Sequence, residues 1–200
     1  KEQLAQAHQE RAVRRKLRAK RKIPEIALIG YTNTGKSTLL RALTGAETLI
    51  EDKLFATLDP LTRQMYLPDG QLVVITDTVG FIKKLPHPLI PAFASTLETA
   101  QTADLVLNVL DVSNPNLFDH WRTITEVLNS IFKNGARPPM LNVLNKVDKL
   151  HTLEDHQRLE EALSTLANSV VISAKERVGI EELKGRIGRM LKHPSGTRAA

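Results

Sequence analysis

The sequence predicts an α/β fold with a six-stranded, mostly parallel sheet, helices on both faces and one antiparallel strand at the edge. Two observations predict it. From Ile23 onward, short apolar runs rich in β-branched residues alternate with segments of helical periodicity, which is the pattern of βαβ units. The Pro-Asp-Gly turn within PDGQ, residues 68–71, joins two strands as a hairpin and therefore reverses one of them.

The expected strands are short apolar runs, and they lie at 23–29, 63–67, 72–76, 105–110, 139–144 and 169–173. Between the fourth and fifth strands, apolar residues recur every three or four positions and so share one helix face: Leu117, Trp121, Ile124, Leu128 and Ile131. Residues 180–191 repeat this pattern and predict a closing helix. Segments 45–62 and 78–91 show neither period, and loops of that length in a compact domain are usually functional.

Composition limits the class of protein. The chain has 200 residues, enough for one domain with a sizeable core, and no apolar run approaches the roughly 18 residues that cross a bilayer. It has no cysteine, which excludes disulfides, thiolate metal sites and cysteine nucleophiles. We therefore expect no membrane attachment and a location in the cytoplasm or an organelle matrix. We also expect a monomer.

Basic residues are concentrated at the start of the chain. Residues 1–22 hold nine Lys or Arg and two Glu, which predicts a basic helical segment, the end of a preceding region. Such a segment either contacts a phosphate backbone or is a solvated helix end. Residues 23–193 form the expected domain, and 194–200 a flexible tail.

The stretch GYTNTGKS, residues 30–37, matches G-x-x-x-x-G-K-[ST] between an expected strand and an expected helix. Its glycines let the backbone wrap a phosphate, Lys36 reaches the β- and γ-phosphates, and the Ser37 hydroxyl binds Mg²⁺. The competing interpretation is a turn rich in Gly and Thr. The predicted phosphate site comprises Gly30, Tyr31, Thr32, Asn33, Thr34, Gly35, Lys36, Ser37 and Thr38.

Three shorter motifs follow in order. In DTVG, Asp77 ends a strand, where its carboxylate can hold magnesium, and the Gly80 amide can bond a γ-phosphate. In NKVD, the Asp148 carboxylate can accept hydrogen bonds from the ring N–H and the exocyclic amine of guanine, which favours binding of GTP over ATP. SAK follows the last strand and would pack against the same base. The base site therefore comprises Asn145, Lys146, Asp148, Ser173, Ala174 and Lys175.

Together these motifs resemble the translation-factor-like class of GTPases, with a P-loop GTPase fold. The segments LFATLDPLTR, 54–63, and DTVGFIKKLPHPLIPAFASTLE, 77–98, are similar to the HflX family in particular, and the likeness covers residues 11–192. Membership implies GTP or GDP and Mg²⁺ as ligands, a large ribosomal subunit as partner, and in several members the splitting of stalled or idle ribosomes.

The resemblance also implies roles for single residues. Thr57 would be the switch threonine that binds magnesium with Ser37 and Asp77, and Thr62 is its rival. Lys36, Thr57 and Gly80 would form the catalytic set. Asn33 resembles a ligand of potassium in related GTPases, although an asparagine tolerated in a tight loop fits equally well.

Phe81 stands where other GTPases have a glutamine that positions water. A phenyl ring cannot do this, so we expect slow hydrolysis by the isolated domain and stimulation by the ribosome. Two alternatives stay open. One is a ribosome- or RNA-binding module that GTP orders and in which hydrolysis is incidental. The other is an RNA-processing GTPase of the Era or TrmE type.

Overall fold

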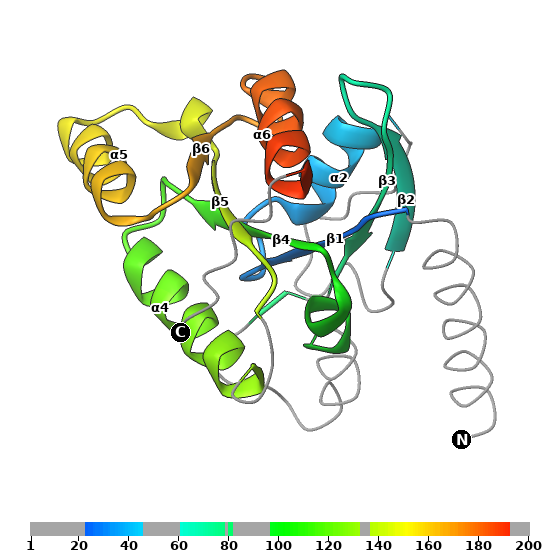
Figure 1. The fold of residues 1–200 in the computed structure, drawn as a ribbon. Coiled ribbons are helices and arrows are strands. Elements are labelled where there is room, and N and C mark those ends of the chain that lie inside the picture. Colours follow the sequence, from blue (N-terminus) through cyan, green and yellow to red (C-terminus); the bar gives the residue numbers. More distant parts are fainter. Residues whose placement is uncertain (1–22, 46–60, 79, 82–96, 133–136, 193–200) are drawn as a thin grey trace.

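The computed structural model describes residues 23–45, 61–78, 80–81, 97–132 and 137–192. Within these ranges six strands form one sheet in the order β2-β3-β1-β4-β5-β6, shown in Figure 1. Only the β2–β3 pair is antiparallel, so the predicted fold class is confirmed. The strands are β1 (Glu25–Gly30), β2 (Leu61–Tyr66), β3 (Leu72–Asp77), β4 (Leu105–Asp111), β5 (Met140–Asn145) and β6 (Ser169–Val171).

Helices cover both faces of the sheet. On one face lie α2 (Lys36–Thr44) and α6 (Ile180–Lys192), and on the other lies α4 (Leu117–Ile131) (Figure 1). Further helices are α5 (Leu153–Thr165) and the short 3-10 helix η2 (Val147–Lys149), and residues 97–102 are helical as well. The predicted basic segment, 1–22, and tail, 194–200, lie outside the described ranges, so these domain bounds stay predictions.

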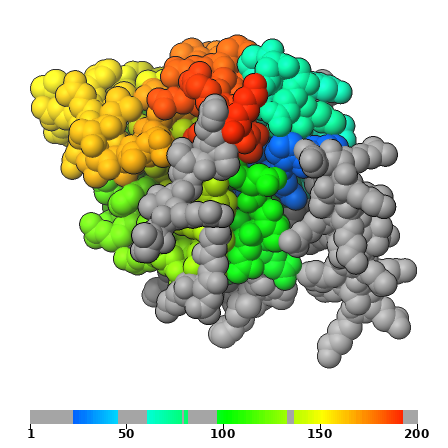
Figure 2. All heavy atoms as spheres, in the orientation of Figure 1, coloured from blue at the N-terminus to red at the C-terminus, as the bar shows by residue number. Residues whose placement is uncertain are grey.

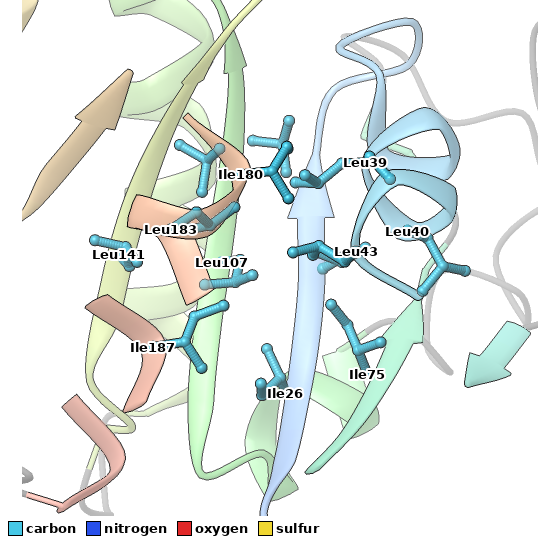
Figure 3. Close-up of a cluster of buried hydrophobic side chains, with 14 of the residues drawn as sticks. Ile26, Leu39, Leu40, Leu43, Ile75, Leu107, Leu141, Ile180, Leu183 and Ile187 are labelled. Atoms are coloured by element: carbon cyan, nitrogen blue, oxygen red, sulfur yellow. The ribbon is translucent and has the colours of Figure 1, made fainter. Parts of the chain in front are cut away.

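The core is divided by the alternation of strand side chains. In β1, Ile26 and Leu28 pack with α2 and α6, whereas Ala27 and Ile29 pack with α4. Figure 3 shows the first of these clusters, in which Ile26, Leu107 and Leu141 from three adjacent strands meet the apolar faces of the two helices. Because the central strands are buried on both faces, their carboxyl ends are held at fixed positions.

On the surface, α6 lies between α5 and the β2–β3 hairpin (Figure 2). The Lys192 ammonium at the end of α6 contacts the Asp69 carboxylate of the hairpin turn at 2.6 Å. None of the helices in the described part of the chain is long and apolar enough to cross a membrane.

The structure shifts some predicted boundaries. Strand β2 begins at Leu61, two residues earlier than expected, because Leu61 pairs with Asp77 where β3 ends. Strand β6 ends at Val171, and Ser173 instead forms an antiparallel bridge with Val178. Phe81 falls in a segment expected to be loop, but it forms a parallel bridge with Tyr31.

Candidate nucleotide-binding site

Pieces of all four motifs lie at one edge of the sheet. Gly30, Asp77 and Asn145 end strands β1, β3 and β5, and Ser173 lies two residues after β6. These four strands run parallel through the β3-β1-β4-β5-β6 order, so their carboxyl ends face the same side. This is the edge at which open α/β sheets bind ligands.

The phosphate loop turns tightly from β1 into α2. Gly35 is the N-cap of α2 with φ of 94°, a left-handed conformation that favours glycine. A Cβ at this position would lie 2.5 Å from Nδ2 of Asn145, so a side chain has no space either. The Thr34 hydroxyl donates to the Tyr31 carbonyl at 3.0 Å. The loop thereby places the first turn of α2, with Lys36, Ser37 and Thr38, at the edge of the sheet.

Lys36 is almost fully buried in this loop. Its ammonium donates to the Tyr31 carbonyl at 2.9 Å. Burial lowers the pKa of Lys36 to about 8, while the negative charge of Asp77 acts in the opposite direction. A buried ammonium of this kind gains charge stabilisation from a phosphate, which is the chemistry predicted for this lysine.

Ser37 and Asp77 supply the oxygen atoms expected for magnesium. The Ser37 hydroxyl donates to Oδ2 of Asp77 at 2.7 Å, and Asp77 is fully buried. A hydroxyl and a carboxylate this close are hard oxygen donors that fit Mg²⁺. The third predicted ligand, Thr57, lies outside the described residues. The alternative candidate, Thr62, lies opposite Thr76 in the β2–β3 ladder, and the two hydroxyl oxygens are 3.2 Å apart.

The base motifs are tied to the phosphate loop by Asn145. Its Nδ2 donates to the Thr34 carbonyl at 2.8 Å, and its Oδ1 accepts from the Ala174 amide at 2.9 Å. Beside it, the Ser173 hydroxyl donates to Oδ1 of Asp148 at 2.5 Å. The amide of Glu176 then donates to the Ser173 oxygen at 3.0 Å. NKVD, SAK and the phosphate loop therefore form one hydrogen-bonded unit.

Phe81 is part of the core. Its side chain is 3% exposed and belongs to the cluster that packs with α4. The preceding residue, Gly80, lies against the phosphate loop so closely that a Cβ would be 2.9 Å from the Lys36 ammonium nitrogen and from Cα of Thr32. The end of DTVG is therefore in direct contact with the phosphate loop.

A family model described as "50S ribosome-binding GTPase" matches residues 25–146, more than half of the chain. The chain belongs to the 50S ribosome-binding GTPase family. This match includes the first strand, the phosphate loop, DTVG and the beginning of NKVD.

Relatives refine the position within the 50S ribosome-binding GTPases. The chain is 44% identical over 190 residues to GTPase HflX of Caldanaerobacter subterraneus subsp. tengcongensis, covering 95% of this chain and 42% of that protein. It is 47% identical over 193 residues to GTPase HflX of Chlamydia pneumoniae, covering 96% and 40%. The resemblance to the HflX family is therefore confirmed, and the chain spans about two fifths of the length of these relatives.

A solved structure supports the fold. The GTP-binding protein of the hyperthermophilic archaeon Sulfolobus solfataricus, in complex with GDP, matches with a TM-score of 0.66 and 26% identity. The match covers 94% of this chain and 59% of that protein chain.

Sequence reasoning missed one contact in this GTPase domain. Oδ2 of Asp111, at the end of β4, lies 2.8 Å from the Lys146 ammonium. The sequence feature that could have indicated this contact is an acidic residue, Asp111, at the end of an apolar strand. By contrast, Lys175 was expected beside the base, but its side chain is 75% exposed and its ammonium contacts Glu176 at 3.0 Å. The binding roles given to the motif residues stay predictions.

Proposed function

We propose that the chain binds guanine nucleotides with Mg²⁺ at the carboxyl edge of the sheet and hydrolyses GTP to GDP and phosphate. The Asn145 bridge carries this proposal, because one side chain joins the phosphate loop at Thr34 to the base motif at Ala174. A nucleotide spans the same two elements. Asp148, oriented by the Ser173 hydroxyl, supplies the acceptor for the N–H groups of guanine.

Different residues of the chain would bind different parts of the nucleotide. The amides of the phosphate loop and the first turn of α2 surround the phosphates, and Lys36 places its ammonium against the β- and γ-oxygens. The Gly80 amide bonds the γ-phosphate. Ser37, Asp77 and Thr57 would hold Mg²⁺, which when bound neutralises charge that develops on the phosphate oxygens.

Slow intrinsic hydrolysis is part of the proposal. Phe81 offers no polar group and is buried beside Tyr31, so it does not position water. A partner then has to order the site or supply a catalytic group. We propose the large ribosomal subunit, in agreement with membership of the 50S ribosome-binding GTPase family. We propose splitting or recycling of stalled ribosomes as an activity at the level of the HflX relatives, of whose length the chain spans about two fifths.

The test is GTP turnover by the chain with and without purified large ribosomal subunits. We expect acceleration of roughly 10³-fold or more, the range seen when a partner completes a GTPase site. Equal rates in both samples would contradict the ribosomal trigger, and absence of turnover in both would contradict the enzyme. Co-sedimentation with large subunits at raised salt would measure the contribution of basic residues 1–22.

A second candidate is a binding module in which GTP orders the chain for RNA contact and hydrolysis is incidental. The burial of Phe81 favours it, because the site holds no water-positioning side chain at this place. A non-hydrolysable GTP analogue separates the two candidates. An enzyme stays bound to its ribosomal partner with the analogue, whereas a binding module is released at the same rate as with GTP.

Potassium is a finer part of the proposal. Asn33 has a left-handed backbone with φ of 62°, so it sits at a sharp turn of the phosphate loop. Its side-chain oxygen would be one ligand of K⁺ beside the phosphates. GTP turnover measured in potassium and in sodium buffers tests this role, and equal rates would contradict the use of potassium.

A further inference from the structure

The Lys146 ammonium joins two elements of the site. It contacts Oδ2 of Asp111 at 2.8 Å and donates to the carbonyl oxygen of Asn33. The first partner ends β4, and the second belongs to the phosphate loop. The side chains of Lys146 and Asp111 are 21% and 14% exposed, so water screens the pair less than it screens a surface ion pair.

The backbone of Lys146 is held in place by contacts that do not involve its side chain. Its φ is 71°, a left-handed conformation that is uncommon for a residue other than glycine. Two backbone hydrogen bonds hold this turn: the amide of Val147 donates to the Ile172 carbonyl at 3.3 Å, and the amide of Lys149 donates to the Lys146 carbonyl at 2.9 Å. The stem of Lys146 therefore starts from a defined point next to Asn145.

The Asp111 carboxylate is fixed independently of Lys146. Its Oδ1 accepts from the Ser113 amide at 3.0 Å and from the Ser113 hydroxyl at 2.6 Å. Its backbone lies opposite Asn145 in the β4–β5 ladder. The carboxylate is thus a rigid acceptor attached to the edge of the sheet.

A lysine side chain has many rotamers, and restricting them when a ligand binds costs affinity. A fixed carboxylate that holds the ammonium restricts them in advance. The stem is then extended between its turn and the phosphate loop, where the base is proposed to lie against it. The loop contact with Asn33 alone supplies no counter charge for the ammonium.

We propose that Asp111 is a positioning residue for guanine-nucleotide binding, which acts by holding the Lys146 side chain in the conformation that contacts the base. This inference rests on the proposed function and adds to it a residue outside the four motifs. An ordinary structural ion pair between β4 and the NKVD loop is the competing explanation. The two differ in whether nucleotide affinity depends on the pair.

The experiment measures the affinity of fluorescent GDP and of a fluorescent non-hydrolysable GTP analogue for the full chain and its variants. We expect Asp111→Asn to weaken both by about tenfold, a coupling of ordinary size between contacting residues. We expect GTP turnover at saturating nucleotide to be unchanged, because the Asp111 carboxylate contacts Ser113 and Lys146, which lie outside the predicted catalytic set. In a Lys146→Met background, Asp111→Asn should change affinity by less than about twofold.

Asp104→Asn is the matched control. Asp104 precedes the opposite end of β4, where its Oδ2 accepts from the Glu25 amide at 2.8 Å. We expect this control to leave both affinities unchanged. Ser113→Ala is a milder second variant that removes only one of the bonds to Asp111, and a loss of about twofold to threefold is expected. It keeps the proposal testable if Asp111→Asn does not fold.

The outcomes are distinct. Unchanged affinity in Asp111→Asn, or an equal loss with and without Lys146, would overturn the positioning role and leave the proposed function intact. If Asp111→Asn does not fold, unchanged nucleotide affinity in Ser113→Ala would overturn the positioning role. A wild-type chain that binds no guanine nucleotide would overturn the proposed function together with this inference.

Discussion

The ring of Phe81 packs against the ring of Tyr31, with centroids 6.5 Å apart and planes tilted by 36°. Tyr31 in turn stacks on His120 of α4, at a centroid distance of 3.8 Å. Two backbone bonds support this contact: the Phe81 amide donates to the Gly30 carbonyl, and the Thr32 amide donates to the Phe81 carbonyl, both at 2.9 Å. The residue that follows DTVG is therefore a packing residue that joins this motif to the phosphate loop.

Replacing Phe81 by glutamine should not create a fast GTPase. The glutamine amide would be placed in an apolar cluster without hydrogen-bond partners, which costs about 1–3 kcal/mol in addition to the lost ring packing. We expect a lower free energy of unfolding and an intrinsic turnover within a few fold of wild type. Urea unfolding and GTP turnover measure the two effects. Phe81→Leu is the control, since it stays apolar, and turnover raised by about 100-fold in Phe81→Gln would contradict this packing role.

The buried Lys36 ammonium should make stability depend on pH. Its folded pKa of about 8 lies below the unfolded value of 10.5. Between these values the unfolded chain binds more protons than the folded chain, so the free energy of unfolding rises with pH. The contribution of Lys36 to the free energy of unfolding is constant below about pH 8. It rises by about 3 kcal/mol in total as the pH passes from the folded to the unfolded pKa.

The measurement is urea unfolding of the nucleotide-free chain from pH 7 to pH 10, compared with Lys36→Met. We expect the variant to lose the part of the slope that Lys36 contributes, because methionine has a similar length and no charge. Parallel curves for the two proteins would show that Lys36 keeps its ordinary pKa.

Asn145→Asp should separate nucleotide binding from general stability. The substitution removes the donor to the Thr34 carbonyl and places a negative oxygen beside it in a buried position. We expect GDP affinity to fall by about 10- to 100-fold. Competition with fluorescent GDP measures this loss.

Asn142→Asp is the control for that substitution. Asn142 is also a buried residue of β5, and its Nδ2 donates to the Ala167 carbonyl at 2.9 Å. We expect it to lower stability without a comparable loss of GDP affinity. An equal loss of affinity in both variants would assign the effect of Asn145 to folding.

The two candidate switch threonines can be separated by their magnesium dependence. Thr62 faces Thr76, and successive side chains in a strand point to opposite faces, so Thr62 lies on the face away from Asp77. We expect Thr57→Ala to raise the Mg²⁺ concentration needed for GTP hydrolysis and Thr62→Val to leave it unchanged. Magnesium titrations of turnover test this, and the reverse result would assign the switch role to Thr62.

The motifs were predictable because each follows a strand with a strong apolar signal. The structure adds that Gly30, Asp77 and Asn145 lie together at the carboxyl edge of the sheet. The helical period likewise predicted α4, whose residues Leu117, Ile124 and Leu128 are buried.

Other features depend on contacts that a linear pattern does not contain. Helix α5 was not singled out because Ala162 is its one buried side chain, although the Thr152 and Asp155 capping box marks its start. The contact of Asp111 with Lys146 requires the β4–β5 register. The burial of Phe81 requires the bridge to Tyr31, which no local period indicates.

The central claim is that the carboxylate of Asp148, held by Ser173, selects guanine. The most direct measurement compares GTP and XTP binding by wild type and Asp148→Asn, because xanthine carries an acceptor where guanine carries its amine. We predict that the variant loses GTP affinity by at least about 100-fold and gains XTP affinity by a similar factor. An unchanged preference for GTP in the folded variant would contradict the claim.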